Sequence, residues 1–324
     1  MLTYVVRRLL YSVVVVLLSS FIIFSFVRLS TDPLAYAKMN PAVSELTLKN
    51  IAARKHLNDP IPVQYLYWLK DAVTNKFGTT TVGNRPILPD LARVMGHTLQ
   101  LVVIAEMLAL LIAVGIGVYS ALRQYSVFDY SATTFSFLGL ATPVFWLALM
   151  LQVLMVNIYQ WTGYHVFPIA SLNSVDPGSG IHFALDRAQH LALPVLVLMV
   201  ASIATYSRFM RAAMLEVVNA DYVRTARAKG LKEKRVVMKH AFRNALIPMV
   251  TLVALNFGAL LGGAVVTETV FSLDGMGLYF INALGAGDPY PIMAWLMITA
   301  VIVVIFNLLA DITYGFLDPR VRYE

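Results

Sequence analysis

Six long runs of apolar residues constrain this chain more than any other feature of its sequence. A helix needs roughly 20 mostly apolar residues to cross the hydrocarbon layer of a membrane. The runs cover residues 9–27, 98–122, 131–158, 191–207, 245–267 and 292–310. The chain is 59% hydrophobic and 13% charged. It is therefore predicted to be an all-α polytopic membrane protein with six transmembrane helices, the fourth of which continues to Val218.

The first run could be a cleaved signal peptide, because Arg7 and Arg8 precede it. However, it is longer than a signal-peptide core, and no small-x-small cleavage site follows it. A retained first helix is the expectation.

The distribution of Lys and Arg predicts the orientation, because basic residues favour the cytoplasmic side of a membrane. With the N-terminus inside, the cytoplasmic segments 1–8, 123–130, 208–244 and 317–324 hold 15 of the 25 Lys and Arg. The outer loops 159–190 and 272–291 hold one. Segment 30–97 holds eight, but long segments cross largely regardless of charge. Both termini are predicted to be cytoplasmic, and the net charge of +7 needs no nucleic-acid partner to explain it.

These spans divide the chain into three parts. Residues 1–29 form an N-terminal transmembrane helix, 30–97 an extracytoplasmic insertion, and 98–324 a five-helix core with the charged loop 208–244. Within the insertion, Ser44 is a candidate N-cap and Gly78 a candidate helix terminator. The insertion is either a loop packed on the outer mouth of the helices or a platform for an extracytoplasmic partner.

No enzyme chemistry is indicated by the sequence. There is no Cys, no Gly-Lys dipeptide and hence no phosphate-binding P-loop, no His-Glu-x-x-His pair and no Gly-x-Ser-x-Gly elbow. The chain is not predicted to hold a cofactor or metal. Proline residues 143, 194 and 248 are expected to bend membrane helices, and Gly258 and Gly262 have the spacing of close helix contact.

Glu106 is the one charged residue inside the second run. An ionisable side chain within a membrane is expensive and usually functional. It is either a satisfied polar group that pairs with a neighbouring helix or faces a wet cavity, or a functional residue that lines a pathway or carries a proton. Glu268 and Asp311 lie at the ends of runs, where a position at the membrane interface would explain them.

The loop 208–244 holds ten of the 25 Lys and Arg, concentrated in the stretch 221–248, DYVRTARAKGLKEKRVVMKHAFRNALIP. Asp221 is a candidate N-cap, and Gly230 is placed to end a helix in the left-handed conformation. The residues between them, 222–229, make about two turns. Tyr222, Val223 and Ala226 share one face of this helix. A second amphipathic run follows and leads into the fifth span, which is expected to break at Pro248.

Two interpretations of this loop remain open. Its Lys and Arg could contact anionic lipid headgroups. Alternatively, a short capped helix with aromatic and small residues is suited to docking in the groove of a partner protein.

The stretch 221–248 resembles the cytoplasmic EAA loop of the permease subunits of bacterial ABC importers, in the version found in the dipeptide, oligopeptide and nickel type. Four other segments resemble the same family: YVVRRLL near the N-terminus, TPVFWLALML (142–151), TETVFSLDGMG (267–277) and DPRVRY (318–323). The long outer segment after the first span is similar to that of the first of the two paired permeases. Two departures are visible: the Glu-Ala-Ala element reads Thr225-Ala226-Arg227, and Asp274 stands where the family often has Pro.

The resemblance implies the pore-forming permease of an ATP-driven importer in the bacterial cytoplasmic membrane. Its partners would be a second permease, two ATPase subunits that bind ATP and Mg, an extracytoplasmic binding protein, membrane lipids and a peptide substrate. The residues implied in ATPase coupling are Tyr222, Ala226 and Gly230 on the docking face, with Arg224, Thr225, Arg227 and Lys229 around it.

Alternatives stay open at this point. Relatives of this type carry di- and oligopeptides, glutathione or nickel, and peptide is the expectation. From other classes, the chain could be an ion-coupled secondary transporter that uses Glu106, or a membrane scaffold.

Overall fold

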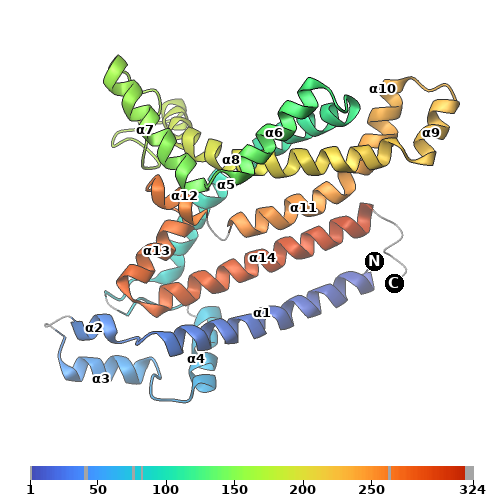
Figure 1. Ribbon diagram of the computed structural model, residues 1–324. Coiled ribbons are helices and arrows are strands. Elements are labelled where there is room, and N and C mark those ends of the chain that lie inside the picture. The colour runs from blue at the N-terminus through green and yellow to red at the C-terminus, as the bar shows by residue number, and fades with distance from the viewer. Residues whose placement is uncertain (1, 40–42, 75–76, 82, 262–263, 318–324) are drawn as a thin grey trace.

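The computed structural model describes residues 2–39, 43–74, 77–81, 83–261 and 264–317, which form helices joined by loops (Figure 1). In chain order these are α1 (Leu2–Ser30), α2 (Ala35–Met39), α3 (Glu45–Arg54), α4 (Ile61–Thr74), α5 (Ile87–Leu122), α6 (Val127–Ala141), α7 (Val144–Thr162), α8 (Ile181–Val218), α9 (Asp221–Ala228), α10 (Glu233–Arg235), the π-helix η1 (Val236–Phe242), α11 (Arg243–Leu261), α12 (Val265–Val270), α13 (Met276–Ala286) and α14 (Pro289–Leu317). Among the described residues, six helical stretches are long and apolar enough to cross a membrane: Val5–Ser30, Ile87–Leu122, Val144–Thr162, Ile181–Val218, Glu233–Leu261 and Pro289–Thr313. The predicted all-α fold with six membrane helices is confirmed.

The third predicted span is not one continuous helix. Residues 131–158 were expected to form one helix, but α6 ends at Ala141 and α7 begins at Val144. Thr142 has ψ of 119°, an extended conformation that a following proline favours. Figure 1 shows α6 and α7 diverging from this junction. The bend at Pro143 was expected, but it separates two helices, and only α7 has the length of a span.

The other two prolines do not break their helices. α8 continues through Pro194 and reaches Val218, as predicted, although it begins at Ile181 rather than at residue 191. α11 likewise continues through Pro248, so the predicted break there is wrong. A proline removes a single backbone hydrogen bond, and membrane helices tolerate this loss because the remaining bonds and neighbouring helices hold the backbone.

Helices α5 and α8 form the centre of the molecule. They run in the same direction and approach closely at Gly117, where a Cβ atom would lie 2.7 Å from the Cβ of Met210 and from the carbonyl oxygen of Ser207. Gly258 likewise permits the close approach of α11 and α14, because a Cβ there would lie 2.9 Å from the Cβ of Phe306. The predicted close contact at Gly258 is confirmed, whereas Gly262 lies outside the described residues.

The outer segment packs on the ends of α1 and α14. Tyr65 and Trp68 of α4 are buried in one cluster with Phe24 of α1 and Met293 of α14. Ser44 is the predicted N-cap of α3, accepting a hydrogen bond from the backbone N–H of Thr47. At the opposite end of the same two long helices, Arg8 of α1 pairs with Asp311 of α14 at 2.8 Å, with both side chains partly exposed.

Candidate functional site

The short helix predicted in the charged loop is present as α9. It begins at Asp221 and ends at Ala228. Its N-cap is Ala220, so the prediction that Asp221 is the N-cap is wrong. Asp221 is instead the first helical residue, where a negative charge complements the helix dipole. Gly230 has φ of +74°, which confirms the predicted left-handed backbone that glycine adopts without a Cβ penalty.

One side of α9 is buried against the chain itself. Val223 is fully buried and Ala226 is 6% exposed. Both belong to an apolar cluster that we call the loop core. Its other buried members are Ala113, Ala121, Tyr206, Met210, Ala213, Met214, Val236, Val237, Ala241, Ala245 and Met249. Ala226 therefore packs inward on α8 and η1 and does not share an exposed face with Tyr222.

The exposed side of α9 presents a different set of residues. Tyr222 is 47% exposed, and Arg224, Thr225 and Lys229 are exposed beside it. The hydroxyl of Thr225 donates to the backbone carbonyl of Asp221 at 2.9 Å. A partner protein that approaches this helix would meet these four side chains first.

Arg227 connects α9 to the segment that follows it. Its Nη2 donates to Oε1 of Glu233 at 2.8 Å, and its Nη1 donates to the carbonyl oxygen of Val218 at 3.3 Å. The hydrogen bond to Glu233 raises the pKa of Arg227 above its usual value. Arg227 thus links the ends of α8, α9 and α10 within the chain.

Glu106 lies at the meeting point of three membrane helices. It is 2% exposed, and its Oε1 and Oε2 accept hydrogen bonds from the hydroxyls of Ser202 and Tyr206, each at 2.5 Å. Asn256 of α11 in turn donates to the Tyr206 hydroxyl at 3.1 Å. The geometry is that of a satisfied polar group joining α5, α8 and α11, and a proton-carrying role stays a hypothesis.

Glu268, at the end of an apolar run, is fully buried inside the protein. Its carboxylate accepts hydrogen bonds from the Thr98 hydroxyl at 2.7 Å and from the backbone N–H of Gly277 at 2.6 Å. A Cβ at Gly275 would lie 2.5 Å from this carboxyl group, and one at Gly277 would lie 2.4 Å from the Cα of Val265. The segment 267–277 therefore folds around Glu268, which caps the N-terminus of α13 and ties it to α5.

Asp129 and Arg211 form an ion pair that the sequence did not reveal. Nε and Nη2 of Arg211 donate to the two carboxylate oxygens of Asp129 at 2.6 and 2.7 Å, and the Asp129 side chain is 3% exposed. The guanidinium of Arg211 holds the pKa of Asp129 below its usual value of 3.8. The pair fixes the start of α6 on α8, a few turns before α9. Its only sequence signal was a carboxylate directly before an apolar run.

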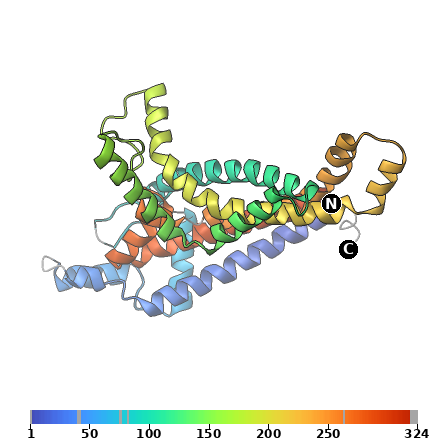
Figure 2. The same ribbon diagram turned by 45° about the horizontal axis from the view of Figure 1, so that its top comes forward.

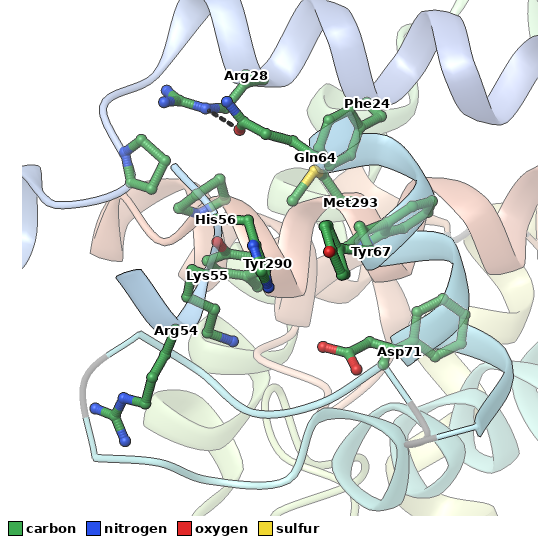
Figure 3. A pocket seen from close by; sticks show the side chains of 14 residues that line it. Phe24, Arg28, Arg54, Lys55, His56, Gln64, Tyr67, Asp71, Tyr290 and Met293 are labelled. Carbon is green, nitrogen blue, oxygen red and sulfur yellow. Dashed lines mark hydrogen bonds between the residues drawn. The ribbon is translucent and has the colours of Figure 1, made fainter. Parts of the chain in front are cut away.

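The outer segment carries a cavity of about 30 Å³ between α3, α4 and the ends of α1 and α14 (Figure 3). The ring of His56 stacks on Tyr67 at 3.6 Å, and Arg28 donates to the side chain of Gln64 at 2.8 Å. Lys55 lies 4.1 Å from the ring centre of Tyr290. Burial lowers the pKa of Lys55. This cavity holds about one water molecule, and the contacts around it attach the insertion to the membrane helices.

Together, these contacts define one mechanical unit. α9 is fixed to α8 and η1 by the loop core, and α8 is fixed to α5 and α11 by the bonds of Tyr206. These contacts therefore connect α9 to three membrane helices.

Comparisons with known proteins place the chain beside membrane components of transport systems. The profile of the family described as "Binding-protein-dependent transport system inner membrane component" matches residues 113–323, and the profile of its N-terminal part matches residues 1–91. Among curated proteins, the oligopeptide transport system permease protein AppB of Bacillus subtilis (strain 168) is 40% identical over 328 residues, 100% of both chains. The dipeptide transport system permease protein DppB of Alkalihalophilus pseudofirmus is 34% identical over 339 residues, again 100% of both chains. The oligopeptide transport system permease protein OppB of Mycobacterium tuberculosis (strain ATCC 25618 / H37Rv) is 36% identical over 321 residues, 98% of each chain.

Proposed function

The chain belongs to the family of binding-protein-dependent transport system inner membrane components, and we propose that it is the pore-forming permease of an ATP-driven importer for di- or oligopeptides. The observation that carries this proposal is similarity over the full length to permeases named for oligopeptide and dipeptide transport. Nickel and glutathione are the alternative substrates within the same type of importer. The protein is an integral membrane protein, and we place both of its termini in the cytoplasm because most of the basic residues then lie there.

Four partners complete the proposed assembly. A second, homologous permease would form the other half of the pore. Two ATPase subunits would bind ATP and Mg; one would dock on α9, through Tyr222, Arg224, Thr225 and Lys229, and the other on the matching helix of the second permease. An extracytoplasmic binding protein would deliver the solute to the outer face, where the insertion 30–97 packs on α1 and α14. This division of labour agrees with a sequence that lacks a phosphate-binding loop.

The structure suggests how ATPase closure would act on the pore. α8 has 38 residues and is about 57 Å long at 1.5 Å per residue. Because the loop core fixes α9 to α8 and to the start of α11, a push on the exposed side of α9 moves both helices together. The Glu106–Tyr206–Asn256 contacts then transmit the motion to α5. In this role Ala226 and Gly230 position the helix, and Tyr222 makes the contact.

The test is uptake by a strain lacking the gene, compared with the same strain complemented by the chain. Labelled di-, tri- and longer peptides are supplied in parallel with radioactive nickel, and either ATP or the proton gradient is depleted. We expect peptide uptake to depend on the gene and on ATP. Loss of nickel uptake with unchanged peptide uptake would overturn the assignment of peptide as the substrate. Uptake that survives ATP depletion and fails with the proton gradient would favour an ion-coupled transporter that uses Glu106.

Two point variants separate coupling from general damage in the same assay. Tyr222→Ala removes an exposed ring from α9, whereas Tyr164→Ala removes a ring that is 76% exposed in the outer loop after α7. We expect the first variant to lose ATP-dependent uptake and the second to retain it. Equal uptake by the two variants would contradict the proposed docking face.

A further inference from the structure

The segment that follows α9 has an unusual backbone. Residues 236–242 form a π-helix, η1, in which hydrogen bonds close five residues apart. Val236 and Ala241, five residues apart, are both fully buried, and Val237 and Ala245 are buried with them. The wide turn thus keeps one side of η1 directed into the loop core. π-Helical turns are rare and often occur at functional sites.

The opposite side of this segment carries a row of cations. Arg235, Lys239 and Arg243 recur every four residues, are exposed, and alternate with the buried positions. None of the three makes an ion pair or a side-chain hydrogen bond with any other residue that the structure describes. Glu233, the acidic residue of this segment, is already bonded to Arg227. We call Arg235, Lys239 and Arg243 the cationic row.

The position of the cationic row indicates what it meets. α10 and η1 run across the direction of α1, α8 and α14, at the level along the bundle where α1 begins (Figures 1 and 2). Arg243, the last residue of the row, is the first residue of α11, an apolar helix within the candidate span Glu233–Leu261. A helix that enters the membrane at this level passes through the headgroup layer. Met238, beside the row, is 52% exposed and supplies an apolar side chain at the same level.

We propose that the cationic row is a binding surface for anionic phospholipid headgroups, distinct from the ATPase-docking side of α9. The phosphates of the headgroups would supply the negative charge that the described protein residues do not. α9 lies beyond α10 and η1 at this end of the molecule (Figure 1), so a partner can occupy α9 while lipid occupies the row. The row lies at the cytoplasmic leaflet if both termini are cytoplasmic, and this part of the inference rests on the proposed function.

The expected strength follows from the number of cations. Each Lys or Arg near an anionic surface increases lipid affinity about fivefold, so three of them give roughly a hundredfold preference over a neutral lipid. Because the headgroups are exposed to solvent, the preference weakens as salt rises and the screening length falls. Salt dependence therefore distinguishes an effect of the charges in the cationic row from an effect of the shapes of its side chains.

The experiment uses the purified full chain in neutral phosphatidylcholine nanodiscs with increasing phosphatidylglycerol. Spin-labelled phosphatidylglycerol and phosphatidylcholine report how strongly each lipid is held at the protein surface. Arg235→Gln, Lys239→Gln and Arg243→Gln are combined in one variant. The control, which removes the same charge from outer exposed positions, combines Lys49→Gln, Lys70→Gln and Arg85→Gln. A charge-retaining variant (Arg235→Lys, Lys239→Arg, Arg243→Lys) tests shape.

We expect the Gln variant to lose the phosphatidylglycerol preference by about a hundredfold, and the control and charge-retaining variants to keep it. An unchanged preference in the Gln variant overturns the proposal. So does a Gln variant that retains the preference but no longer binds the ATPase subunits, because the row would then be a protein-binding surface. If lipid preference behaves as expected but the wild-type chain supports no ATP-dependent peptide uptake, the lipid surface stands and the proposed function fails.

Discussion

Replacing Ala226 with leucine tests whether α9 is held by its own chain. Ala226 is 6% exposed and packs in the loop core with Val223, Met210 and Val236. Inserting extra methylene groups into a packed core costs typically 1–3 kcal/mol. A helix of eight residues has little stability of its own. The overpacking penalty therefore lowers the free energy that holds α9 against the loop core. We expect the loop core to open locally while the six membrane helices remain inserted.

Two measurements report the effect. Amide hydrogen exchange over residues 221–229 should rise roughly 5- to 150-fold, because each 1.4 kcal/mol corresponds to a factor of ten in the opening equilibrium. Peptide-stimulated ATP hydrolysis by the assembled importer should fall, since a displaced α9 no longer transmits force to α8. Membrane insertion, followed by extraction and size-exclusion chromatography, should not change.

Two matched variants separate attachment from docking. Thr225→Leu places the same side chain on the exposed side of α9, and we expect coupling to fall with exchange unchanged. Gly230→Ala meets no atom within 4 Å but forces an L residue to adopt φ of +74°, at roughly 1–2 kcal/mol, so a smaller rise in exchange is expected. If Ala226→Leu left both the exchange rates and the peptide-stimulated ATP hydrolysis at wild-type values, the inward packing of Ala226 would be refuted.

Three further predictions concern contacts between helices. Tyr206→Phe leaves Glu106 and Asn256 each without one hydrogen bond, so we expect a loss of about 1–3 kcal/mol in stability, seen as a lower melting temperature in detergent; an unchanged melting temperature would speak against the contact. Gly277→Ala places a Cβ 2.4 Å from the Cα of Val265 and should prevent recovery of folded protein, whereas Gly285→Ala in the same helix meets nothing within 4 Å and should behave as wild type; equal yields would contradict this. Asp129→Asn should lower the melting temperature by a constant amount between pH 5 and 8. The pKa of Asp129 is depressed, so the stabilisation by its ion pair is fully present above pH 3.8 and is lost only as the pH falls through the lowered pKa. A difference that varied within that range would point to another titrating group.

The membrane helices could be predicted from the sequence, because apolar length alone determines whether a segment can cross a bilayer. The end of α9 was also predictable, since Gly230 has a specific backbone requirement. The break before Pro143 was not, because proline is compatible both with a helix interrupted at that point, as at α6–α7, and with a continuous one, as in α8.

Contacts between distant residues were beyond sequence reasoning. Helical periodicity placed Tyr222 and Ala226 on one face of α9, but it could not show what covers that face. In the structure the loop core covers Ala226. Glu268 was expected at the membrane interface because it lies at the end of an apolar run. Its bond to the backbone N–H of Gly277 could not be predicted, since a backbone group leaves no signal in the sequence. Asp129 and Arg211 lie 82 residues apart, so no local pattern connects them.

The burial of Val223 and Ala226 also affects how a partner would assemble with this chain. Ordering a disordered segment of eight residues on binding would cost roughly 8–16 kcal/mol of backbone entropy. α9 is already folded against α8 and η1, so a partner that docks on its exposed side meets a preorganised surface. Association should then be close to rigid-body. Its heat-capacity change should reflect only the surface covered at the contact, without the larger change that accompanies coupled folding.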